Sequence, residues 1–349
     1  MGETRARFRS LSRVWPDGPS ALIADWLKLG FDVTNPSAKV MESLKEHWPH
    51  ISTPSSDDSV ADNHSYVYSK ELKGLSSFGL HICENANEVY PNAIIVKNVE
   101  AAFDFILNKV SVPEWTGRGV DTPEEVQCEN NVLVGPDCVF GQGVVLESGV
   151  RIGARVKIGD HTRIGANSFI ADDTEIGHHC RLKSHAAIGG YGFGLIRYPK
   201  DNFARIRKHI GRVVIGNRVN IGSFVSIDRG VLSDTTIANG TCLDNHIQIA
   251  HNCSLGQNNV LCSYVGLSGS THFGNNVTVG GMVGSKGHLT VGDNVMVAGQ
   301  SGITTNIPSN SQVKGYPPRP ISEALKIEVL TGKLPEIYER LKALEKALK

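Results

Sequence analysis

The sequence lacks any excess of charge, any long apolar run and any closely spaced pair of cysteines. Its 35 Lys and Arg residues balance 35 Asp and Glu residues, which argues against nucleic acid as a partner. No apolar run is long enough to span a bilayer, and the basic start is not followed by the apolar core of a signal peptide. The seven cysteines include no Cys-x-x-Cys pair, which argues against zinc and favours free thiols. We therefore expect a cytoplasmic protein without a membrane span.

What the sequence has instead is a bulky apolar residue that returns at every sixth position between residues 134 and 303. The series opens with a run that has no miss: Val134, Phe140, Leu146, Ile152, Ile158, Ile164, Ile170, Ile176, Leu182 and Ile188. It resumes, with breaks, at Ile215, Ile221 and Ile227, then from Ile237 to Val279, and finally from Val291 to Ile303; Ser285 interrupts it. A period of six fits neither a helix nor a plain strand, so it indicates a repeat architecture.

One hexad is long enough for a short strand and a turn. Three hexads make a triangular coil, and successive coils stack about 4.8 Å apart like neighbouring strands. The apolar residue is expected to point inward, and the small residue that often follows it, such as Gly135 or Gly153, to turn the corner. The pattern predicts a parallel β-helix of roughly eight coils, in which each coil supplies hydrogen-bond partners to the next.

The segments outside the repeat predict two further parts. Residues 1–115 form an expected α/β domain, and residues 116–313 form the β-helix. The elements expected in the first part are helices at residues 21–29, 38–48 and 99–110 and strands at residues 79–83 and 92–96. Two insertions, at residues 189–213 and 228–235, interrupt the hexads and are expected to project from corners as loops, which often carry function.

The C-terminal segment, residues 314–349, reads as two helices. These are expected at residues 321–330 and 335–348, after the prolines that end the repeat. The second helix carries basic side chains outside its apolar stripe, among them Lys342 and Lys346. They predict either a solvated face or a surface that docks an acidic partner.

The hexad spacing brings three residues into one column. His251 lies two places after the apolar Ile249, Gly269 lies one coil above it, and His288 lies two coils above it and one residue along. The column would span about 10 Å, from two strand spacings. An imidazole beside an exposed backbone N–H suits acyl transfer, because the imidazole accepts a proton while the N–H stabilises the oxyanion.

Several separate motifs then match a known family in order and spacing. They are Gly192-Phe193-Gly194, residues 210–216 (IGRVVIG), Ile227-Asp228-Arg229-Gly230 and residues 243–252. The chain resembles the UDP-3-O-acylglucosamine N-acyltransferase family from about residue 59 onward. The resemblance implies a homotrimer of left-handed β-helices with active sites in the clefts between subunits. It also implies that a 3-hydroxyacyl chain moves from acyl carrier protein, where 4'-phosphopantetheine holds it, to the 2-amine of UDP-3-O-acylglucosamine. The product would be UDP-2,3-diacylglucosamine of lipid A biosynthesis, with no other cofactor and no metal.

The same resemblance implies roles for individual residues. His251 would be the general base, and Asp244 would orient or support it. His288 would be a second active-site histidine, and Gly269 would supply the oxyanion N–H. The C-terminal helices would meet the acyl carrier protein.

Substrate contacts are implied for four residues, Asn63, Tyr66, Phe193 and Asn252. The first two lie in a stretch that matches the family's uridine-binding segment in the N-terminal domain. Val60 stands where that family has a phenylalanine, which removes one stacking face.

Alternatives to this function remain open from the sequence. One is a related N-acyltransferase that acts on another nucleotide-linked amino sugar, with acyl-CoA as a conceivable donor. Another is a non-catalytic trimeric β-helix scaffold. A third is a zinc enzyme of the carbonic-anhydrase type with His246, His251 and His272 as ligands, although their spacing does not follow that pattern.

Overall fold

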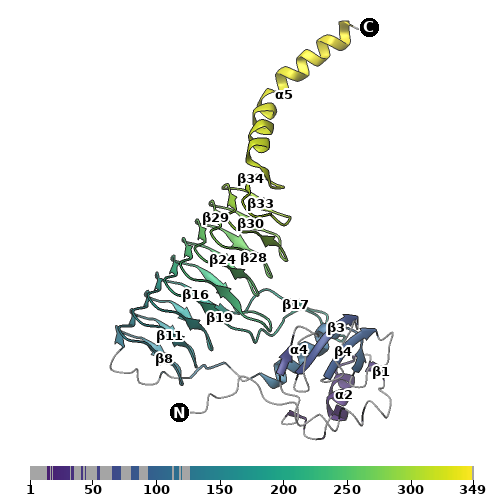
Figure 1. Cartoon of the computed structure of the whole chain (residues 1–349). Coiled ribbons are helices and arrows are strands. Elements are labelled where there is room, and N and C mark those ends of the chain that lie inside the picture. The colour runs from purple at the N-terminus through teal and green to yellow at the C-terminus, as the bar shows by residue number, and fades with distance from the viewer. Residues whose placement is uncertain are drawn as a thin grey trace. The chain divides into compact units, whose positions relative to one another are not determined.

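In the computed structural model the chain forms two compact units (Figure 1). One unit comprises Met1–Gly117, Tyr191–Arg212 and Arg229–Asp234; the other comprises Arg118–Gly190, Val213–Asp228 and Thr235–Lys349. Both insertions therefore group with the N-terminal unit, whereas the expected domain boundaries were contiguous. The structure describes residues 14, 15, 17, 19–31, 33–34, 41, 44, 53–55, 65–71, 80–85, 93–111, 114–117, 119 and 126–347. Most of the helix expected at residues 38–48 lies outside them.

The N-terminal unit contains a five-stranded sheet in the order β1-β5-β4-β3-β2. Its strands are β1 (Val33–Thr34), β2 (Thr53–Ser55), β3 (Ser65–Glu71), β4 (Leu80–Asn85) and β5 (Ala93–Val96), and its helices are α2 (Pro19–Lys28) and α4 (Val99–Val110). Only β1 pairs antiparallel. Helix α4 packs against β3 and β4 and is buried along most of its length. The predictions for α2, α4, β4 and β5 are confirmed to within two residues.

The long insertion completes this unit. Its hairpin, β17 (Leu195–Ile196) and β18 (Arg205–Ile206), is antiparallel, and Ile196 and Ile210 join the apolar core beneath the sheet. Asp104 of α4 is buried and accepts hydrogen bonds from the Tyr198 hydroxyl (3.0 Å) and the Lys208 N–H (2.7 Å). Burial raises the pKa of Asp104, while these hydrogen bonds act to lower it. The insertion is therefore an ordered part of the N-terminal unit.

The second unit is a solenoid with three sheets, each built from strands that pair in parallel with the coil above and below. The first sheet contains β7 (Leu133–Val134), β10 (Arg151–Ile152), β13 (Phe169–Ile170), β16 (Ala187–Gly190), β21 (Ser226–Asp228), β24 (Gln248–Ile249), β27 (Gly266–Leu267), β30 (Gly284–Ser285) and β33 (Gly302–Ile303). The second contains β8 (Val139–Phe140), β11 (Lys157–Ile158), β14 (Glu175–Ile176), β19 (Val213–Ile215), β22 (Thr235–Ile237), β25 (Ser254–Leu255), β28 (His272–Phe273) and β31 (Thr290–Val291).

The third sheet begins earlier and ends later than the other two. It contains β6 (Gln127–Cys128), β9 (Val145–Leu146), β12 (Arg163–Ile164), β15 (Arg181–Leu182), β20 (Asn220–Ile221), β23 (Cys242–Leu243), β26 (Val260–Leu261), β29 (Thr278–Val279), β32 (Met296–Val297), β34 (Gln312–Lys314) and the antiparallel β35 (Arg319–Pro320). The estimate of eight coils was therefore too low, because strands form on both sides of the regular hexad series. The left-handed parallel β-helix itself is confirmed.

The hexad residues form a continuous core inside the prism, as predicted. Ile152, Ile249 and Ile303 are fully buried, and Ile249 pairs in register with Leu267 on the next coil. Even Ser285, which breaks the apolar series, is buried, and its hydroxyl accepts a hydrogen bond from the Ser268 N–H (3.1 Å). A polar residue is tolerated there because its oxygen has a partner.

The small residues after the hexad position do not turn the corners, contrary to expectation. A side chain at Gly135 would lie 2.6 Å from the backbone of Gly153 on the coil above, and one at Gly159 would lie 2.7 Å from Gly177. The turn comes two residues later, where side-chain-bearing residues adopt left-handed dihedrals, such as Asn252 (φ 60°). Glycine is therefore needed for close stacking of coils rather than for its conformational freedom.

The C-terminal segment forms one helix, α5 (Ile321–Ala347), with Pro335 inside it, so the prediction of two helices is wrong. Proline cannot donate to the Thr331 carbonyl, but α5 is exposed and water can solvate that group. Lys314 of β34 and Glu328 of α5 form an ion pair (2.7 Å) near the start of the helix. Within the part of the chain that the structure describes, no helix has the length and apolar character to cross a membrane.

Candidate functional site

The structure brings His251, Gly269 and His288 together at the corner that follows the first sheet, here called the first-sheet corner. The parallel register of β24, β27 and β30 places the turns after these strands one above another. A side chain on Gly269 would lie 2.6 Å from Cε1 and 2.7 Å from Nε2 of His251, so the ring rests against the Gly269 backbone. The His288 N–H donates to the Gly269 carbonyl at 3.0 Å. The column predicted from the hexads is therefore present.

Asn252 sets the tautomer of the His251 ring. The Nδ1 atom of His251 lies 2.9 Å from Oδ1 of Asn252. An amide oxygen only accepts hydrogen bonds, so Nδ1 carries the proton and Nε2 keeps its lone pair. Asn252 is itself held, because its N–H donates to the Thr235 hydroxyl at 2.9 Å. The ring nitrogen beside Gly269 is thus the one that can accept a proton.

The Gly269 N–H is a hydrogen-bond donor without a partner among the residues that the structure describes. At the corresponding place of the second sheet, the Gln257 N–H donates to Oδ1 of Asn275, one coil above, at 2.8 Å. The residue one coil above Gly269 is Gly287, which has no side chain to do this. An unused donor beside a basic imidazole nitrogen can stabilise negative charge that develops on a bound carbonyl oxygen.

A buried carboxyl group, for which the sequence predicted no role, lies one coil below the histidine. Asp228 ends β21, is 9% exposed, and accepts a hydrogen bond from Nε2 of Gln248 at 2.9 Å. Burial raises the pKa of Asp228 to about 6, while the Gln248 hydrogen bond and positive charge on His251 lower it. The sequence signal for this group was its place in the Ile227-Asp228-Arg229-Gly230 motif, where the hexad series breaks.

Asp244 lies elsewhere within one chain, so the expected support of His251 by Asp244 is not seen there. It follows β23 of the third sheet, and its carboxylate accepts hydrogen bonds from the Ser263 hydroxyl and from Nδ2 of Asn245 (2.9 Å). The Ser263 hydrogen bond is the main cause that lowers the pKa of Asp244. Asn252, the neighbour of His251 in sequence, takes the orienting position instead.

The histidines considered for zinc do not converge within one chain. The ring of His246 is stacked between Phe224 and Tyr264, with ring centroids 5.0 Å apart on both sides. The ring of His272 lies 2.7 Å from the Ser254 hydroxyl through Nδ1. No group of three metal-ligating side chains occurs among the described residues.

The predicted substrate contacts are only partly visible. Phe193 lies in the insertion and is 77% exposed. Tyr66 lies in β3, but its side chain, like the whole of Asn63, lies outside the described residues. All four assignments, for Asn63, Tyr66, Phe193 and Asn252, stay predictions.

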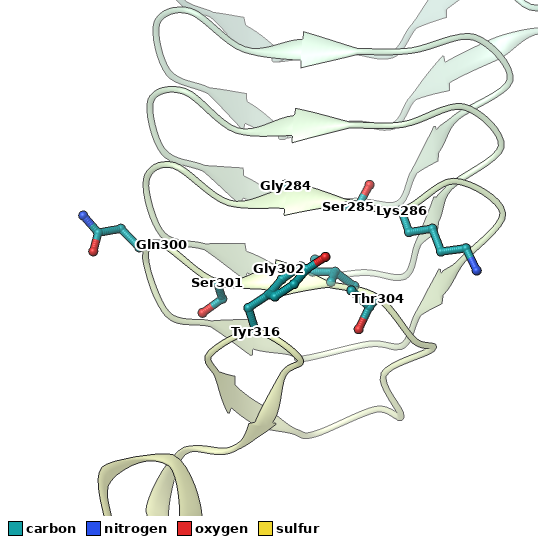
Figure 2. Close-up of a pocket in the computed structure, with 9 residues that line it drawn as sticks. Gly284, Ser285, Lys286, Gln300, Ser301, Gly302, Thr304 and Tyr316 are labelled. Atoms are coloured by element: carbon teal, nitrogen blue, oxygen red, sulfur yellow. The ribbon is translucent and has the colours of Figure 1, made fainter. Parts of the chain in front are cut away.

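A side-chain-free trough runs up the first sheet, beginning on the coil of Gly269. Its floor consists of Gly266, Gly284 and Gly302, the outward-facing residues of three successive strands, and a side chain at either of the first two would meet nothing within 4 Å. At the top, the Tyr316 ring covers Gly302, where a side chain would lie 1.9 Å from Cδ2 of Tyr316. Figure 2 shows Tyr316 lying across the end of this space, a cavity of about 490 Å³ whose wall includes Lys286.

Comparison with known proteins agrees with this geometry. Residues 155–190 match a family model described as bacterial transferase hexapeptide (six repeats). A UDP-3-O-acylglucosamine N-acyltransferase from Thermosynechococcus vestitus is 51% identical over 163 residues, 47% of this chain and 48% of that protein. The UDP-3-O-acylglucosamine N-acyltransferase 1 of Francisella tularensis is 49% identical over 180 residues, 51% of this chain and 52% of that protein. The matches thus span about half the length of these relatives.

Among solved structures, LpxA from Acinetobacter baumannii superposes with a TM-score of 0.50 and 24% sequence identity. The match covers 58% of this chain and 77% of that one, and at this identity it supports the fold alone. The chain is therefore a hexapeptide-repeat, left-handed β-helix protein that resembles the UDP-3-O-acylglucosamine N-acyltransferases over half its length.

Proposed function

We propose that this protein is an N-acyltransferase that moves a 3-hydroxyacyl chain from acyl carrier protein to the 2-amine of UDP-3-O-acylglucosamine. The observation that carries the proposal is the His251 imidazole, with Nε2 free of its proton, lying against Gly269, whose N–H has no partner within the described residues. The names of the relatives supply the acceptor. The product would be UDP-2,3-diacylglucosamine, made in the cytoplasm, where carrier protein and nucleotide sugar are both present.

The reaction would use the two groups at the first-sheet corner in sequence. The acceptor amine attacks the thioester carbonyl, and Nε2 of His251 takes the proton that the nitrogen loses. Charge that develops on the carbonyl oxygen is stabilised by the Gly269 N–H. When the tetrahedral intermediate collapses, the C–S bond breaks and the protonated imidazole returns its proton to the departing thiolate of phosphopantetheine. Asn252 keeps Nδ1 as the donor throughout, so the base is always the nitrogen that faces the substrate.

The trough of the first sheet would hold the acyl chain. Glycines at three successive outward positions leave room for an extended alkyl chain beside the reacting carbonyl. The Tyr316 ring across Gly302 would meet the methyl end and limit the length of the chain. The Lys286 ammonium at the wall would favour a polar or anionic group of the donor over a bare alkyl tail.

A homotrimer would complete the site. His251 and His288 are accessible at the corner of a single chain, so a partner surface is needed to shield the reaction from water. Asp244 follows the third sheet of its own chain, and it would serve the His251 of a neighbouring copy, in the cleft between subunits. The basic residues of α5, such as Lys342 and Lys346, would meet the acidic acyl carrier protein.

The test is an acylation assay with UDP-3-O-acylglucosamine and a panel of acyl carrier protein thioesters, read by mass spectrometry. The expected product carries one new amide on the glucosamine. Amide formation only on other UDP- or dTDP-amino sugars, or only from acyl-CoA, would replace the substrate assignment and keep the chemistry. Absence of transfer to every acceptor would favour a scaffold, and stoichiometric zinc in the purified protein would favour a metalloenzyme.

A further inference from the structure

The hairpin of the long insertion has one face in the core of the N-terminal unit and one face in solvent. Strands β17 and β18 pair Leu195 with Ile206 and Ile196 with Arg205, and paired side chains lie on the same face of a sheet. Ile196 is buried, so Leu195 and Ile206 point away from the core. The large apolar side chains of residues 191–206 that are at least 40% exposed are Tyr191, Phe193, Leu195, Phe203 and Ile206. Apolar side chains gathered in this way mark a surface that another molecule covers.

The exposed ring at the tip of the hairpin is held in place. Asp201 accepts two hydrogen bonds from the Arg205 guanidinium, one of them 3.0 Å long. The same guanidinium lies 5.0 Å from the centroid of the Phe203 ring. The Lys200 ammonium donates to the Lys28 carbonyl at 2.8 Å and so ties the tip to the C-terminal end of α2. A ring that is already fixed in its exposed position loses little freedom when a partner covers it.

The charges of the hairpin are almost all of one sign. Among residues 195–208, Asp201 is the one acidic residue, and the five basic residues are Arg197, Lys200, Arg205, Arg207 and Lys208. The hairpin therefore carries a net charge of +4 in a chain whose total charge is zero. Arg197 is exposed, and its guanidinium lies 3.5 Å from the Asn202 carbonyl across the hairpin. The balance of charge over the whole chain thus conceals a local basic cluster beside the apolar side chains.

We propose that this hairpin docks onto the surface of an anionic lipid bilayer through Leu195, Arg197, Phe203 and Ile206, here called the hairpin patch. The apolar side chains enter the boundary between headgroups and acyl chains, while the basic side chains meet the phosphates. Both kinds of side chain find partners on a bilayer, whereas an acidic protein that binds through its charges would leave the apolar ones in water. The docking is confined to the surface, because no helix in the part of the chain that the structure describes could cross a membrane. It goes beyond acyl transfer and does not depend on it.

Sedimentation of the full-length protein with lipid vesicles tests the proposal directly. One set of vesicles contains phosphatidylcholine alone, and the other contains equal parts of phosphatidylcholine and the anionic phosphatidylglycerol. The protein should sediment with the mixed vesicles and stay in solution with the neutral ones. Binding should weaken at high salt, because the Debye length falls to about 3 Å at 1 M. No binding to the mixed vesicles, or equal binding to both sets, would overturn the proposal.

A charge placed in the apolar part of the patch should weaken the binding. Leu195→Asp removes a 55% exposed leucine, and Val139→Asp is the matched control, because Val139 is a 59% exposed residue on the second sheet of the solenoid. Leu195→Asp should lower the partition coefficient at least about tenfold, since an apolar side chain leaves the interface and the headgroups repel the new carboxylate. Val139→Asp should match the wild type. Equal losses in the two variants would show that the patch is not the contact.

A charge reversal tests the basic part of the patch without touching its apolar side chains. Arg197→Glu should weaken binding to the mixed vesicles at least about fivefold, which is the contribution of one basic residue near an anionic surface. Arg218→Glu is its control, because Arg218 is an exposed arginine at the corner that follows β19. It should bind as the wild type does. If Arg197→Glu instead weakened binding of acyl carrier protein and left vesicle binding unchanged, the patch would be a protein contact and the proposal would be wrong.

Discussion

The corners that follow the first and second sheets have the same backbone turn, and the second of them is here called the second-sheet corner. Of the two, only the second-sheet corner has side chains that accept hydrogen bonds from, and so cap, its N–H groups in an almost unbroken series. There, the N–H two residues after each inward-facing residue donates to the side chain at the same place one coil above. The caps run Gln142–Asp160–His178–Asn217–Asn239 and then Gln257–Asn275–Asp293–Ser309, with distances between 2.6 and 3.0 Å. Each coil thereby satisfies the corner of the coil below it.

The first-sheet corner starts in the same way and then departs from it. Near its base, the Ala154 N–H donates to Oδ1 of Asp172 at 2.9 Å. Higher up, Gly269 and Gly287 occupy the capping places, and among the described residues no side chain accepts a hydrogen bond from the Gly269 N–H below Gly287. The caps are missing on the coils directly above His251, the candidate general base. A scaffold corner therefore becomes a candidate active site when glycines remove the caps and leave a backbone donor beside the imidazole.

The largest expected effect comes from removing the imidazole at the uncapped corner. His251→Ala should lower turnover by about 100- to 10,000-fold, the usual range for a lost general base. His178→Ala is the matched control, since it removes a histidine from the equivalent place of the second-sheet corner, where the ring caps the Asp160 N–H and lies 3.2 Å from the Asp160 carboxylate. Its turnover should stay near that of the wild type. Steady-state kinetics of both folded variants makes the comparison.

His288→Ala should also slow transfer, but less than His251→Ala. Its backbone N–H holds the Gly269 carbonyl at 3.0 Å, and that bond survives the substitution. A His251→Ala protein with near-normal turnover, or a His178→Ala protein as impaired as His251→Ala, would mean that the corners do not differ in function.

A substitution can also introduce a capping side chain at the first-sheet corner. Gly287→Asn would place an amide oxygen one coil above Gly269, as Asn275 does for Gln257 at 2.8 Å, and so occupy the proposed oxyanion donor. Turnover should fall by about 100- to 1,000-fold, the cost of one lost oxyanion donor. Gly287→Ala is the control for crowding, because any side chain there approaches the Gly269 carbonyl (2.9 Å). If the alanine and asparagine variants lose turnover equally, the N–H is not the donor.

Much of this contrast could be predicted from the sequence because the hexad is a strong periodic signal. The hexad period predicted which residues point into the prism. Because three hexads make one coil, it also predicted that Gly269 lies one coil above His251. Helix α4 was predicted with its observed ends, Val99 and Val110, because its apolar spacing is regular over its whole length. Such local, periodic features need no knowledge of distant contacts.

Features that depend on contacts across coils could not be predicted. The role of the glycines after the hexad position was wrong, because Gly135 is required by the backbone of Gly153, a neighbour only in the folded chain. Within one chain, Asn252 contacts Nδ1 of His251, whereas Asp244 follows another sheet, so its support of a His251 stays a prediction. The trough closed by Tyr316 was also missed, because the loop that returns this ring over Gly302 has no periodic signal.

The outward-facing strand positions beside the two corners also differ in whether they carry side chains. The second sheet carries side chains there, such as Ser254 and His272, whereas the first has Gly266, Gly284 and Gly302. Tyr316→Ala should open the end of the trough and raise kcat/KM for longer acyl chains relative to shorter ones by about tenfold, within the range for one methylene in an apolar pocket. Tyr316→Phe keeps the ring and should keep the preference. An unchanged profile across the thioester panel in the alanine variant would show that the chain does not end at this ring.

The smallest effect should come from removing a cap at the second-sheet corner. Asn275→Ala leaves the Gln257 N–H without its 2.8 Å hydrogen bond and removes the 3.2 Å bond from Nδ2 of Asn275 to Asp293. Because this corner is exposed, water replaces the lost partner, and the free energy of unfolding should fall by only about 0.5–1.5 kcal/mol. For a domain of this size that corresponds to a fall in Tm of roughly 1–6 °C. Turnover should not change, because the uncapped N–H has no imidazole beside it. Thermal unfolding and an acylation assay on the same preparation provide both readings, and a loss of turnover without a loss of stability would show that the second-sheet corner takes part in the chemistry.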